Sequence, residues 1–450
     1  MKNTNPFIYG RSVPAERHIN RHDALMTIFS RIKNMESTAI VGDPQSGKSS
    51  LIKYMISEEV LKSRLKQTSK SLVIVEVDAY AIWLSEKKTP IDFWRFVLDV
   101  VERKLEDGVL KDGIKSVRSN QYGSATLGEY FKLMAKSEKR VLLVIDEFDS
   151  LLHHPNFANA EFFGGLRYLA TQTDGLQLIT SSIMSVVEMD DYSSKINPMG
   201  SPFFNNFIKV TLELFDDDSI SELIKTSLKS TGIKFDEHDM DFVVRLSGRH
   251  PYRLQAACAA LFDGIVTKRD PEDRYLYASE KFSTQTEHHF NEIWKRLDEK
   301  SRTALVIMTV LWLGGMVLGK DYSFGEIERS QSFKPELDKL LKLGLVEKVG
   351  KKSKWQFDFD PLLLWQDQKW QVSCEGMVWW IAKIIVGGSR EIPDFNKWLH
   401  DQEVLGYILT RKQWETIKYL VSKIPSSIGE GMSSVFIQFI KGLFGKGKSG

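Results

Sequence analysis

The sequence predicts a doubly wound α/β domain, with a parallel sheet covered by helices on both faces, in the N-terminal half of the chain. Short apolar runs suited to buried strands alternate there with segments of helical periodicity. A glycine-rich loop also joins the first predicted strand to a helix, which is a ligand-binding position in such folds. From Asp216 onward the pattern becomes helical, which predicts smaller domains in the C-terminal half.

Five segments rich in Val, Ile and Leu are the predicted strands of the sheet. Their apolar runs are nearly continuous, as expected for strands buried on both faces. The strands are Ser37–Gly42, Leu72–Val77, Val141–Ile145, Leu176–Ser181 and Phe207–Leu212. Apolar residues at helical spacing predict helices over His22–Lys33, Gly47–Ser57, Ile91–Leu105 and Phe162–Thr171.

The composition is that of an ordinary globular protein of two or three domains, with 450 residues of which 42% are hydrophobic and 27% charged. The formal net charge is only +2, which argues against a general attraction to nucleic acid or anionic membranes. Two distant cysteines, Cys258 and Cys374, fit a reducing compartment rather than a disulfide framework or a zinc site. No signal-peptide pattern begins the chain, and the uncharged run Leu305–Gly319 is too short to span a bilayer, so we expect a cytoplasmic protein.

Residues 42–49 match the eight-position phosphate loop at every fixed position. Its glycines let the backbone wrap around phosphates with several N–H groups pointing inward. We expect Lys48 to neutralise the β and γ phosphates of ATP, and Ser49 to bind Mg²⁺ through its hydroxyl. The location between an apolar strand and a helix distinguishes the loop from an ordinary glycine–serine turn. The predicted ATP-binding residues of this segment are Gly42, Asp43, Pro44, Gln45, Ser46, Gly47, Lys48, Ser49 and Ser50.

Two carboxylates, Asp146 and Glu147, follow the third predicted strand at the edge where ligands bind in open α/β sheets. We expect Asp146 to hold Mg²⁺ with Ser49, and Glu147 to polarise the attacking water, with Lys48 completing the catalytic set. The alternative is that Glu147 is a carboxylate at the end of a strand with no role in catalysis. Ser181, at the end of the fourth strand, is a candidate contact of the γ-phosphate or the water, although a strand running into a serine-rich loop explains it equally well.

These motifs, with several shorter segments, resemble the STAND group of signal-transduction ATPases, relatives of the AAA+ and Orc/Cdc6 ATPases. Within that group they resemble the bacterial and archaeal branch, in which an ATPase, a helical lid and a winged helix follow one another. The resemblance spans about residues 5–360 and rests on Asn5–Phe7, Ile19–Arg21, Gly42–Ile52, Ile145–Asp149, Ser201–Asn205 and Ser247–Tyr252.

The expected domains are an ATPase core with its N-terminal lead-in over residues 1–215, a helical lid over 216–284, a winged helix over 285–360 and a helical C-terminal region over 361–450. Lid helices are predicted over Ser219–Ser227, Asp236–Leu246 and Tyr252–Val266, followed by a hinge or loop at Asp270–Asp273. The winged helix is expected to contain helices at His288–Leu297, Ser301–Leu313, Phe324–Arg329 and Lys334–Leu343, and a hairpin pairing Gly344–Lys348 with Trp355–Phe359.

The resemblance also implies roles for residues outside the phosphate loop. It places Pro251 against the adenine, Arg249 or Arg253 on the phosphates as a sensor, and Arg21 beside the adenine pocket. For each of the two sensor candidates, a solvated arginine at a helix start is an equally open alternative. Many relatives carry an arginine after the hydroxyl residue of the fourth strand, where this chain has serine, so an arginine finger must come from elsewhere, such as Arg167 or a neighbouring subunit.

The function implied by the resemblance is a slow ATPase that works as a switch, closed with ADP and open with ATP. It further implies a homo-oligomer, a separate effector or sensor protein, and a role in bacterial stress or antiviral defence signalling. Two alternatives stay open at this stage. One is an AAA+ ATPase of the DNA-loading or transposition type, and the other is a nucleotide-bound adaptor with negligible turnover.

The C-terminal third offers two weaker signals. Residues 334–354 carry seven lysines against three acidic residues, a local balance of 7 − 3 = +4, which suits phosphate contacts of a winged helix. However, arginine, the commonest base reader, is missing there, so we favour a winged helix that packs as a regulatory lid over one that binds DNA.

Residues 361–450 are predicted to be mostly helical, with tryptophans that we expect in the core: Trp365, Trp370, Trp379, Trp380, Trp398 and Trp414. Residues 432–444 form a predicted amphipathic helix at the end of the chain. This helix could lie on a membrane surface, bind in a groove of a partner protein or pack on its own domain.

Overall fold

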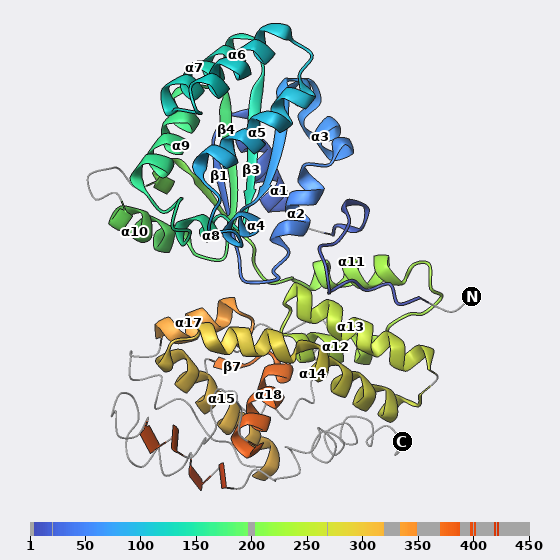
Figure 1. Cartoon of the computed structure of the whole chain (residues 1–450). Coiled ribbons are helices and arrows are strands. Elements are labelled where there is room, and N and C mark those ends of the chain that lie inside the picture. Colours follow the sequence, from blue (N-terminus) through green and yellow to red (C-terminus); the bar gives the residue numbers. More distant parts are fainter. Residues whose placement is uncertain are drawn as a thin grey trace. The chain divides into compact units, whose positions relative to one another are not determined.

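The computed structural model describes residues 4–19, 21–196, 203–267, 269–318, 334–348 and 370–387, together with 397–398, 400–401, 418–419 and 421–422. They belong to two compact units (Figure 1). The sheet unit is Ser12–Glu213, and the helical unit is Met1–Arg11 with Leu214–Gly450. The chain therefore passes between the units twice, at the Arg11–Ser12 and Glu213–Leu214 peptide bonds.

The sheet unit contains five strands, all paired in parallel in the order β2-β3-β4-β1-β5. The strands are β1 (Thr38–Val41), β2 (Leu72–Asp78), β3 (Arg140–Asp146), β4 (Leu176–Ser182) and β5 (Ile208–Thr211). The five predicted strands are confirmed, each to within about two residues at its ends, as boundaries read from sequence usually are. Because β4 lies between β1 and β3, the segments that follow β1 and β3 flank the carboxyl end of β4.

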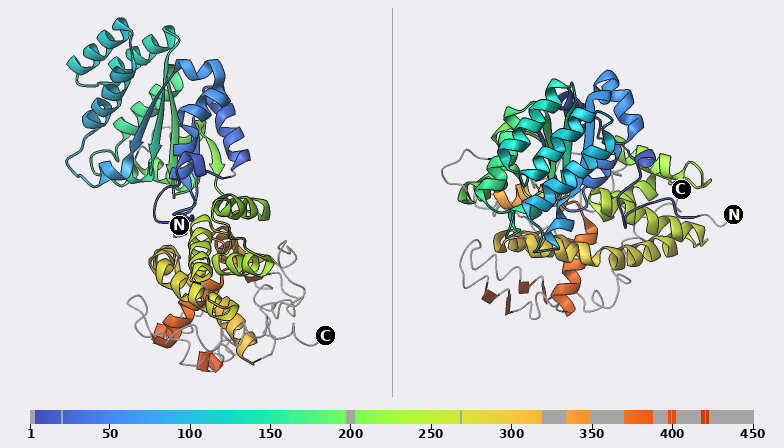
Figure 2. Two further views of the ribbon diagram at one scale, coloured as in Figure 1. Left: turned by 90° about the vertical axis from the view of Figure 1, so that its right-hand side faces the viewer. Right: turned by 45° about the horizontal axis from the view of Figure 1, so that its top comes forward.

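Helices cover both faces of this sheet, as the doubly wound fold requires (Figure 2). The apolar run of β3 supplies both faces, because Val141, Leu143 and Ile145 join one buried cluster while Leu142 and Val144 join the other. The second cluster also includes residues of helices α1 (His22–Lys33), α2 (Lys48–Met55) and α3 (Glu58–Leu65). The predicted doubly wound arrangement is confirmed.

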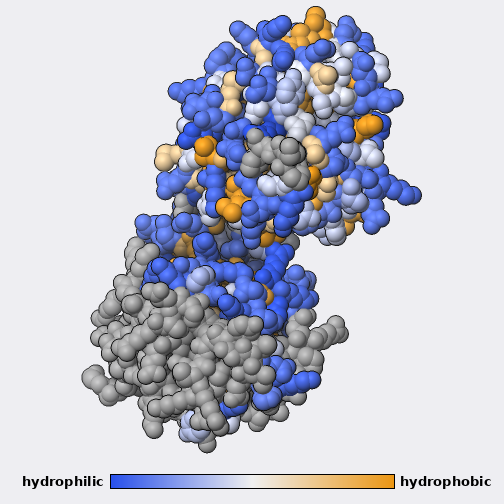
Figure 3. All heavy atoms as spheres, turned by 90° about the vertical axis from the view of Figure 1, so that its left-hand side faces the viewer, coloured by the Kyte–Doolittle hydropathy of each residue, from blue (hydrophilic) through white to orange (hydrophobic). Residues whose placement is uncertain are grey.

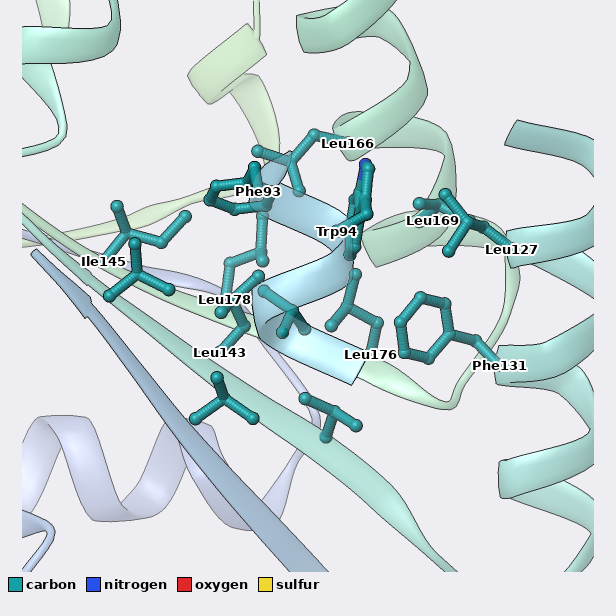
Figure 4. Close-up of a cluster of buried hydrophobic side chains, with 14 of the residues drawn as sticks. Phe93, Trp94, Leu127, Phe131, Leu143, Ile145, Leu166, Leu169, Leu176 and Leu178 are labelled. Carbon is teal, nitrogen blue, oxygen red and sulfur yellow. The ribbon is translucent and has the colours of Figure 1, made fainter. Parts of the chain in front are cut away.

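The first cluster is the larger of the two, and Figure 4 shows part of it. Phe93 and Trp94 of α5 (Pro90–Lys104) lie there between strand residues such as Leu143 and Leu178 and the helices farther out. Thr89 and Asp92 form a capping box that starts α5. The other helices of this side are α6 (Gly108–Ser119), α7 (Ser124–Lys136) and α9 (Ala160–Gln172). Shorter helices of the sheet unit are α4 (Ala79–Trp83), α8 (Asp149–Leu152) and α10 (Val186–Ile196).

The surface of the described residues is mainly hydrophilic on the face that Figure 3 shows, with apolar residues in separate small groups. Large exposed apolar side chains include Met26, Leu84, Val109 and Val187, which come from four different parts of the chain. Single exposed apolar residues of this kind are normal in globular proteins and do not by themselves mark an interface.

The helical unit begins with three helices where the sequence predicts lid helices, α11 (Asp217–Leu228), α12 (Glu237–Ser247) and α13 (Pro251–Val266). These three helices are confirmed, and their role as a lid stays a prediction. The next helix, α14 (Pro271–Arg296), shows that the hinge or loop predicted at Asp270–Asp273 is wrong from Pro271 onward. The Asp270 carboxylate accepts a hydrogen bond from the Asp273 backbone N–H at 2.9 Å, which makes this segment a helix start. Since α14 also runs across residues 284–285, the boundary expected there between lid and winged helix lies inside one helix.

The unit continues with α15 (Glu299–Leu318), α17 (Lys334–Lys342) and α18 (Glu375–Gly387). Strand β6 (Val346–Lys348) pairs in antiparallel fashion with β7 (Trp370–Val372). The hairpin partner predicted at Trp355–Phe359, the helix predicted at Phe324–Arg329 and the amphipathic helix predicted over residues 432–444 lie outside the described residues. The winged helix therefore stays a prediction.

The predicted core tryptophans and the two cysteines lie partly within the described residues. Trp370, Trp379 and Trp380 are buried, which confirms the core interpretation for these three, while the Trp398 ring lies 6.4 Å from that of Trp294. Trp365 and Trp414 lie outside the described residues. Both cysteines are free and buried. Among the helices that the structure describes, none is long and apolar enough to cross a membrane.

The N-terminal lead-in is shared between the units. The Asn5 amide donates to the carbonyl oxygen of Ala259 at 2.8 Å and to the Asp263 carboxylate at 2.9 Å, so this segment packs on α13. Beyond the crossing, the Val13 N–H donates to the Ser50 hydroxyl at 2.9 Å, so the chain there packs on α2. Residues 1–11 of the lead-in thus belong to the helical unit, whereas the sequence predicts them as part of the ATPase core.

Candidate nucleotide-binding site

The phosphate loop connects β1 to α2, as predicted, and its backbone has the conformation that its glycines favour. Gly47 precedes α2 with a φ of 97°, in the left-handed region that suits glycine. A Cβ atom built on Gly47 would meet no atom within 4 Å, so the space beside this residue is open. The first backbone N–H groups of α2 begin at this open position, which is where a phosphate group would be received.

Lys48, the first residue of α2, is buried inside the loop. Its ammonium group donates to the carbonyl oxygens of Gly42 at 2.8 Å and Asp43 at 2.9 Å. Burial lowers the pKa of Lys48, whereas the nearby carboxylates, Asp149 first and then Asp146, oppose that shift. The loop therefore holds a positive charge that lies between its own carbonyl groups and the acidic end of β3.

The residues after β3 are held in place by Ser181 at the end of β4. The Ser181 hydroxyl donates a short hydrogen bond to Oδ1 of Asp146 and accepts one from the Glu147 N–H at 3.2 Å. The Ser181 carbonyl oxygen also accepts the Phe148 N–H at 2.8 Å. Glu147 has a φ of 54°, unusual for a residue with a side chain, and these contacts maintain it. Ser181 thus positions the acidic pair, and its predicted contact with the γ-phosphate stays a prediction.

Glu147 lies in a half-buried acidic environment. Burial raises its pKa above the ordinary value, the carboxylates of Asp146, Asp78 and Asp149 raise it further, and the Lys48 charge opposes the rise. A carboxylate with a raised pKa binds a proton more readily, which is the property required of a general base near neutral pH.

Two acidic residues of this environment were not singled out from the sequence. Asp78 ends β2 in register with Asp146, and its carboxylate accepts the Tyr80 N–H at 3.0 Å at the start of α4. Asp149 begins α8, and its carboxylate accepts the Ile183 N–H at 3.2 Å. Their common location just at the carboxyl ends of strands is the signal that could have identified them.

The predicted Mg²⁺ site at Asp146 and Ser49 stays a prediction, and the contacts of Asp146 are compatible with it. The hydrogen bonds that Asp146 accepts from the Ser181 hydroxyl and from the Glu147 N–H both end on Oδ1, so neither of them uses Oδ2. Mg²⁺ takes few protein carboxylates and keeps water or phosphate oxygens as its other ligands. The described part of the chain contains no group of three or more His, Cys, Asp or Glu side chains that could hold a metal ion.

Two other predicted cofactor-binding residues, Arg21 and Ser50, lie against the phosphate loop. Arg21 donates from Nη2 to the Ser46 carbonyl oxygen at 3.1 Å and from Nη1 to the Glu213 carbonyl oxygen at 2.5 Å. Ser50 uses its hydroxyl to accept the Val13 N–H. These contacts are with the protein backbone, so any contact of either residue with ATP stays a prediction.

The remaining predicted site residues belong to other surroundings. Pro251 begins α13 and Arg249 pairs with the Asp217 carboxylate at 2.6 Å, both within the helical unit. Arg253 is fully buried and donates to the Leu343 carbonyl oxygen at 2.6 Å. In the sheet unit, the charge of Arg167 opposes the burial-driven rise in the pKa of Asp190. Neither the sensor roles nor an arginine finger at Arg167 is tested by these contacts.

Comparisons with known proteins agree with this geometry. A family model described as an AAA-like domain matches residues 15–358. No curated protein matches the chain. Among solved structures, a Walker-type ATPase of Pyrococcus abyssi is similar, with a TM-score of 0.52 and 13% identity over 84% of this chain and 99% of that one. The Aeropyrum pernix ORC2 protein, solved in ADPNP–ADP complexes, has a TM-score of 0.46 and 14% identity over 84% of this chain and 98% of that one. At 13% identity, the likeness to the first of these shows a shared fold.

Proposed function

Because the chain belongs to the AAA-like domain family, we propose that it binds ATP with Mg²⁺ at Gly42–Ser49 and hydrolyses it slowly to ADP and phosphate. The observation that supports this most is the arrangement of Lys48 and Glu147. A buried ammonium group inside the phosphate loop and a carboxylate of raised pKa influence one another across the ends of β1 and β3. This combination suits an anionic substrate that must be attacked by water.

In the proposed reaction, Lys48 leaves the carbonyl oxygens of Gly42 and Asp43 to bind the β and γ phosphates. Ser49 and Asp146 would hold Mg²⁺, and the ion would supply positive charge beside the phosphate oxygens. Glu147 takes a proton from a water molecule as the water oxygen forms a bond to the γ phosphorus. The bond between that phosphorus and the bridging oxygen breaks, and ADP leaves with the electron pair.

The proposed role of this reaction is that of a STAND-type switch, which is closed with ADP and open with ATP. In this role the nucleotide state controls self-association or the activation of a separate effector protein, within bacterial stress or antiviral defence signalling. The two chain crossings support such a role, because both adjoin the phosphate loop. Val13 bonds to Ser50 just after the first crossing, and Glu213 bonds to Arg21 just before the second.

The test combines calorimetry with phosphate release. Wild-type protein with Mg²⁺ should show heat of ATP association and measurable turnover, and Glu147→Gln should bind ATP while releasing phosphate at least about 100-fold more slowly. Glu129→Gln, which alters an exposed glutamate of α7, is the matched control and should behave as wild type.

Three results would contradict parts of the proposal. Absence of ATP association in the folded wild type would exclude the nucleotide site. Binding without turnover, unchanged by Glu147→Gln, would indicate an adaptor rather than an ATPase. Equal particle size of wild type and Glu147→Gln in ATP, measured by light scattering, would exclude control of self-association by nucleotide.

A further inference from the structure

Two glycines of the helical unit, Gly248 and Gly344, meet backbone to backbone. Gly248 follows α12 and Gly344 follows α17, and both have left-handed backbones, with φ values of 61° and 64°. A Cβ atom added to Gly248 would lie 2.1 Å from the Gly344 carbonyl oxygen, and one added to Gly344 would lie 2.4 Å from the Gly248 carbonyl oxygen. Because real Cβ contacts are never so short, this approach requires glycine on both sides. We call the contact the glycine clasp.

Neighbouring contacts hold the clasp closed. The Arg253 guanidinium donates to the Leu343 carbonyl oxygen at 2.6 Å and the Gly344 carbonyl oxygen at 3.3 Å. The Cys374 thiol donates to the Leu246 carbonyl oxygen at 3.4 Å. These bonds join the lid helices α12 and α13 to the turn after α17 and to the residues just before α18.

An ion pair lies next to these contacts. Arg245 donates from Nε to the Glu375 carboxylate at 2.7 Å, and both side chains are largely buried. Backbone, thiol and charged contacts therefore all stabilise the close approach of the two glycines.

A continuous series of bonds leads from the phosphate loop to the clasp. Within the sheet unit, Arg21 donates both to the Ser46 carbonyl oxygen of the phosphate loop and to the Glu213 carbonyl oxygen at the chain crossing. Within the helical unit, the Phe215 N–H just beyond the crossing donates to the Arg249 carbonyl oxygen at 3.0 Å. Arg249 is adjacent to Gly248 in the chain. The backbone from Glu213 through Leu214 to Phe215 joins the two halves of this series.

We propose that the glycine clasp is a nucleotide-controlled latch between the lid and the C-terminal part of the chain. ATP in the phosphate loop displaces the peptide at Glu213 through Arg21, and the displacement opens the clasp. The proposal rests on the proposed function, since it requires ATP to bind at Gly42–Ser49.

The chain contains a natural reporter of this movement. Cys374 is fully buried at the clasp, and burial raises the pKa of its thiol, so it should react slowly with thiol reagents while the clasp is closed. Cys258 is fully buried within α13 and makes none of the clasp contacts named above, so it should react only when the unit unfolds. The rate at Cys374 relative to Cys258 therefore separates clasp opening from general unfolding.

The experiment measures alkylation of each cysteine in the full-length chain by mass spectrometry, with ADP or ATP at saturating concentration and Mg²⁺ present. ATP should raise the Cys374 rate about tenfold over ADP, in the range of ordinary allosteric couplings, with Cys258 protected in both states. ATP affinity is measured by calorimetry on the same preparation. If ATP binds and the Cys374 rate equals that with ADP, the latch is overturned while the nucleotide site stands. If ATP does not bind, the proposed function fails and the latch fails with it.

Variants test the two ends of the series. Gly344→Ala should raise the Cys374 rate without nucleotide while Cys258 stays protected. Gly232→Ala is the matched control, because Gly232 has a φ of 75° but no atom within 4 Å of an added Cβ, so it shares the strain and lacks the collision. Equal Cys374 rates in the two variants would overturn the clasp, as would a parallel rise at both cysteines.

Arg21→Lys tests the route from the phosphate loop. The substitution keeps the charge but loses the planar fork that reaches two carbonyl oxygens. At saturating ATP, the Cys374 rate of this variant should stay at the ADP value. A response equal to that of the wild type would overturn the route through Arg21, whatever happens at Gly344→Ala.

Discussion

Gly47 of the phosphate loop and Gly248 of the lid are both left-handed glycines beside helices, yet they serve opposite purposes. A Cβ atom on Gly47 would meet nothing within 4 Å, whereas one on Gly248 would collide with the Gly344 carbonyl oxygen. At Gly47 the backbone conformation alone demands glycine, and at Gly248 both the conformation and the neighbour do. The same residue type therefore leaves one loop open to a ligand and closes another on the protein.

The buried cations beside the two loops differ in a related way. Lys48 and Arg253 both donate to backbone carbonyl oxygens within their own unit. Lysine is a flexible point charge that can leave its carbonyl partners for a phosphate, whereas arginine holds its partners with a planar fork. We infer that the first contact is exchangeable and the second is structural, and the following predictions test that difference in order of expected effect.

The largest effect is expected from Lys48→Ala. Without its ammonium group, the phosphate loop cannot neutralise the phosphates, and ATP affinity should fall at least about 100-fold, as for other truncated partners of buried charge pairs. Calorimetry with Mg²⁺ checks this, and Lys132→Ala, at an exposed lysine of α7, is the control. Near-normal affinity in Lys48→Ala would mean that the ammonium group is structural, as we infer for Arg253.

Gly248→Ala should lower the free energy of unfolding by about 3 kcal/mol, since left-handed strain and overpacking add together. Gly232→Ala should cost about 1 kcal/mol, because only the strain applies. Denaturant titration followed by circular dichroism measures both. Similar losses of unfolding free energy in the two variants would show that the backbone around Gly248 can move to accommodate the added Cβ atom. The Gly248–Gly344 contact would then be less rigid than its close approach indicates.

Ser181→Ala should reduce the turnover number about 10-fold with a smaller change in KM, because Ser181 holds Asp146 and the Glu147 backbone without being placed on the substrate. Ser182→Ala is a suitable comparison, since that hydroxyl bonds to the Met184 carbonyl oxygen instead. Steady-state phosphate release gives both constants. A pure rise in KM would instead favour direct contact of Ser181 with the γ-phosphate.

The smallest effect concerns the raised pKa of Glu147. A carboxyl group with a higher pKa in the folded state than in the unfolded state destabilises the fold once it is deprotonated, and this cost grows as pH rises through that interval. Glu147→Gln should therefore stabilise the protein slightly at neutral pH, and less so below the ordinary glutamate pKa. Thermal unfolding across pH tests the sign, and destabilisation at neutral pH would contradict the burial and repulsion assigned to this site.

The pH dependence of turnover should follow from the same group. Because Glu147 must be deprotonated to act as a base, turnover should fall on acidification with a midpoint above the ordinary glutamate value. The pH profile of kcat/KM gives this midpoint, and a midpoint at or below the ordinary value would argue against Glu147 as the base.

The sheet unit shows most clearly which structural features can be predicted from the sequence. The continuous apolar run Val141–Ile145 predicted a strand covered on both faces, and the alternation of its residues between two buried clusters confirms it. The same reasoning fails at Asp270–Asp273, where it predicts a hinge or loop although aspartate followed by proline also starts helices. A local pattern that fits two structures cannot choose between them without the packing around it.

By itself, the amino-acid sequence determined the parallel α/β domain, its phosphate loop and its strand-end acidic pair, because these depend on local periodicity and on residue types at fixed spacing. Only the tertiary structure decided that Ser181 holds the acidic pair, that Arg21 joins the phosphate loop to the chain crossing, and that Gly248 meets Gly344. Each of these contacts joins residues far apart in the chain, and their distances are set by how the whole core packs, which no short stretch of sequence encodes.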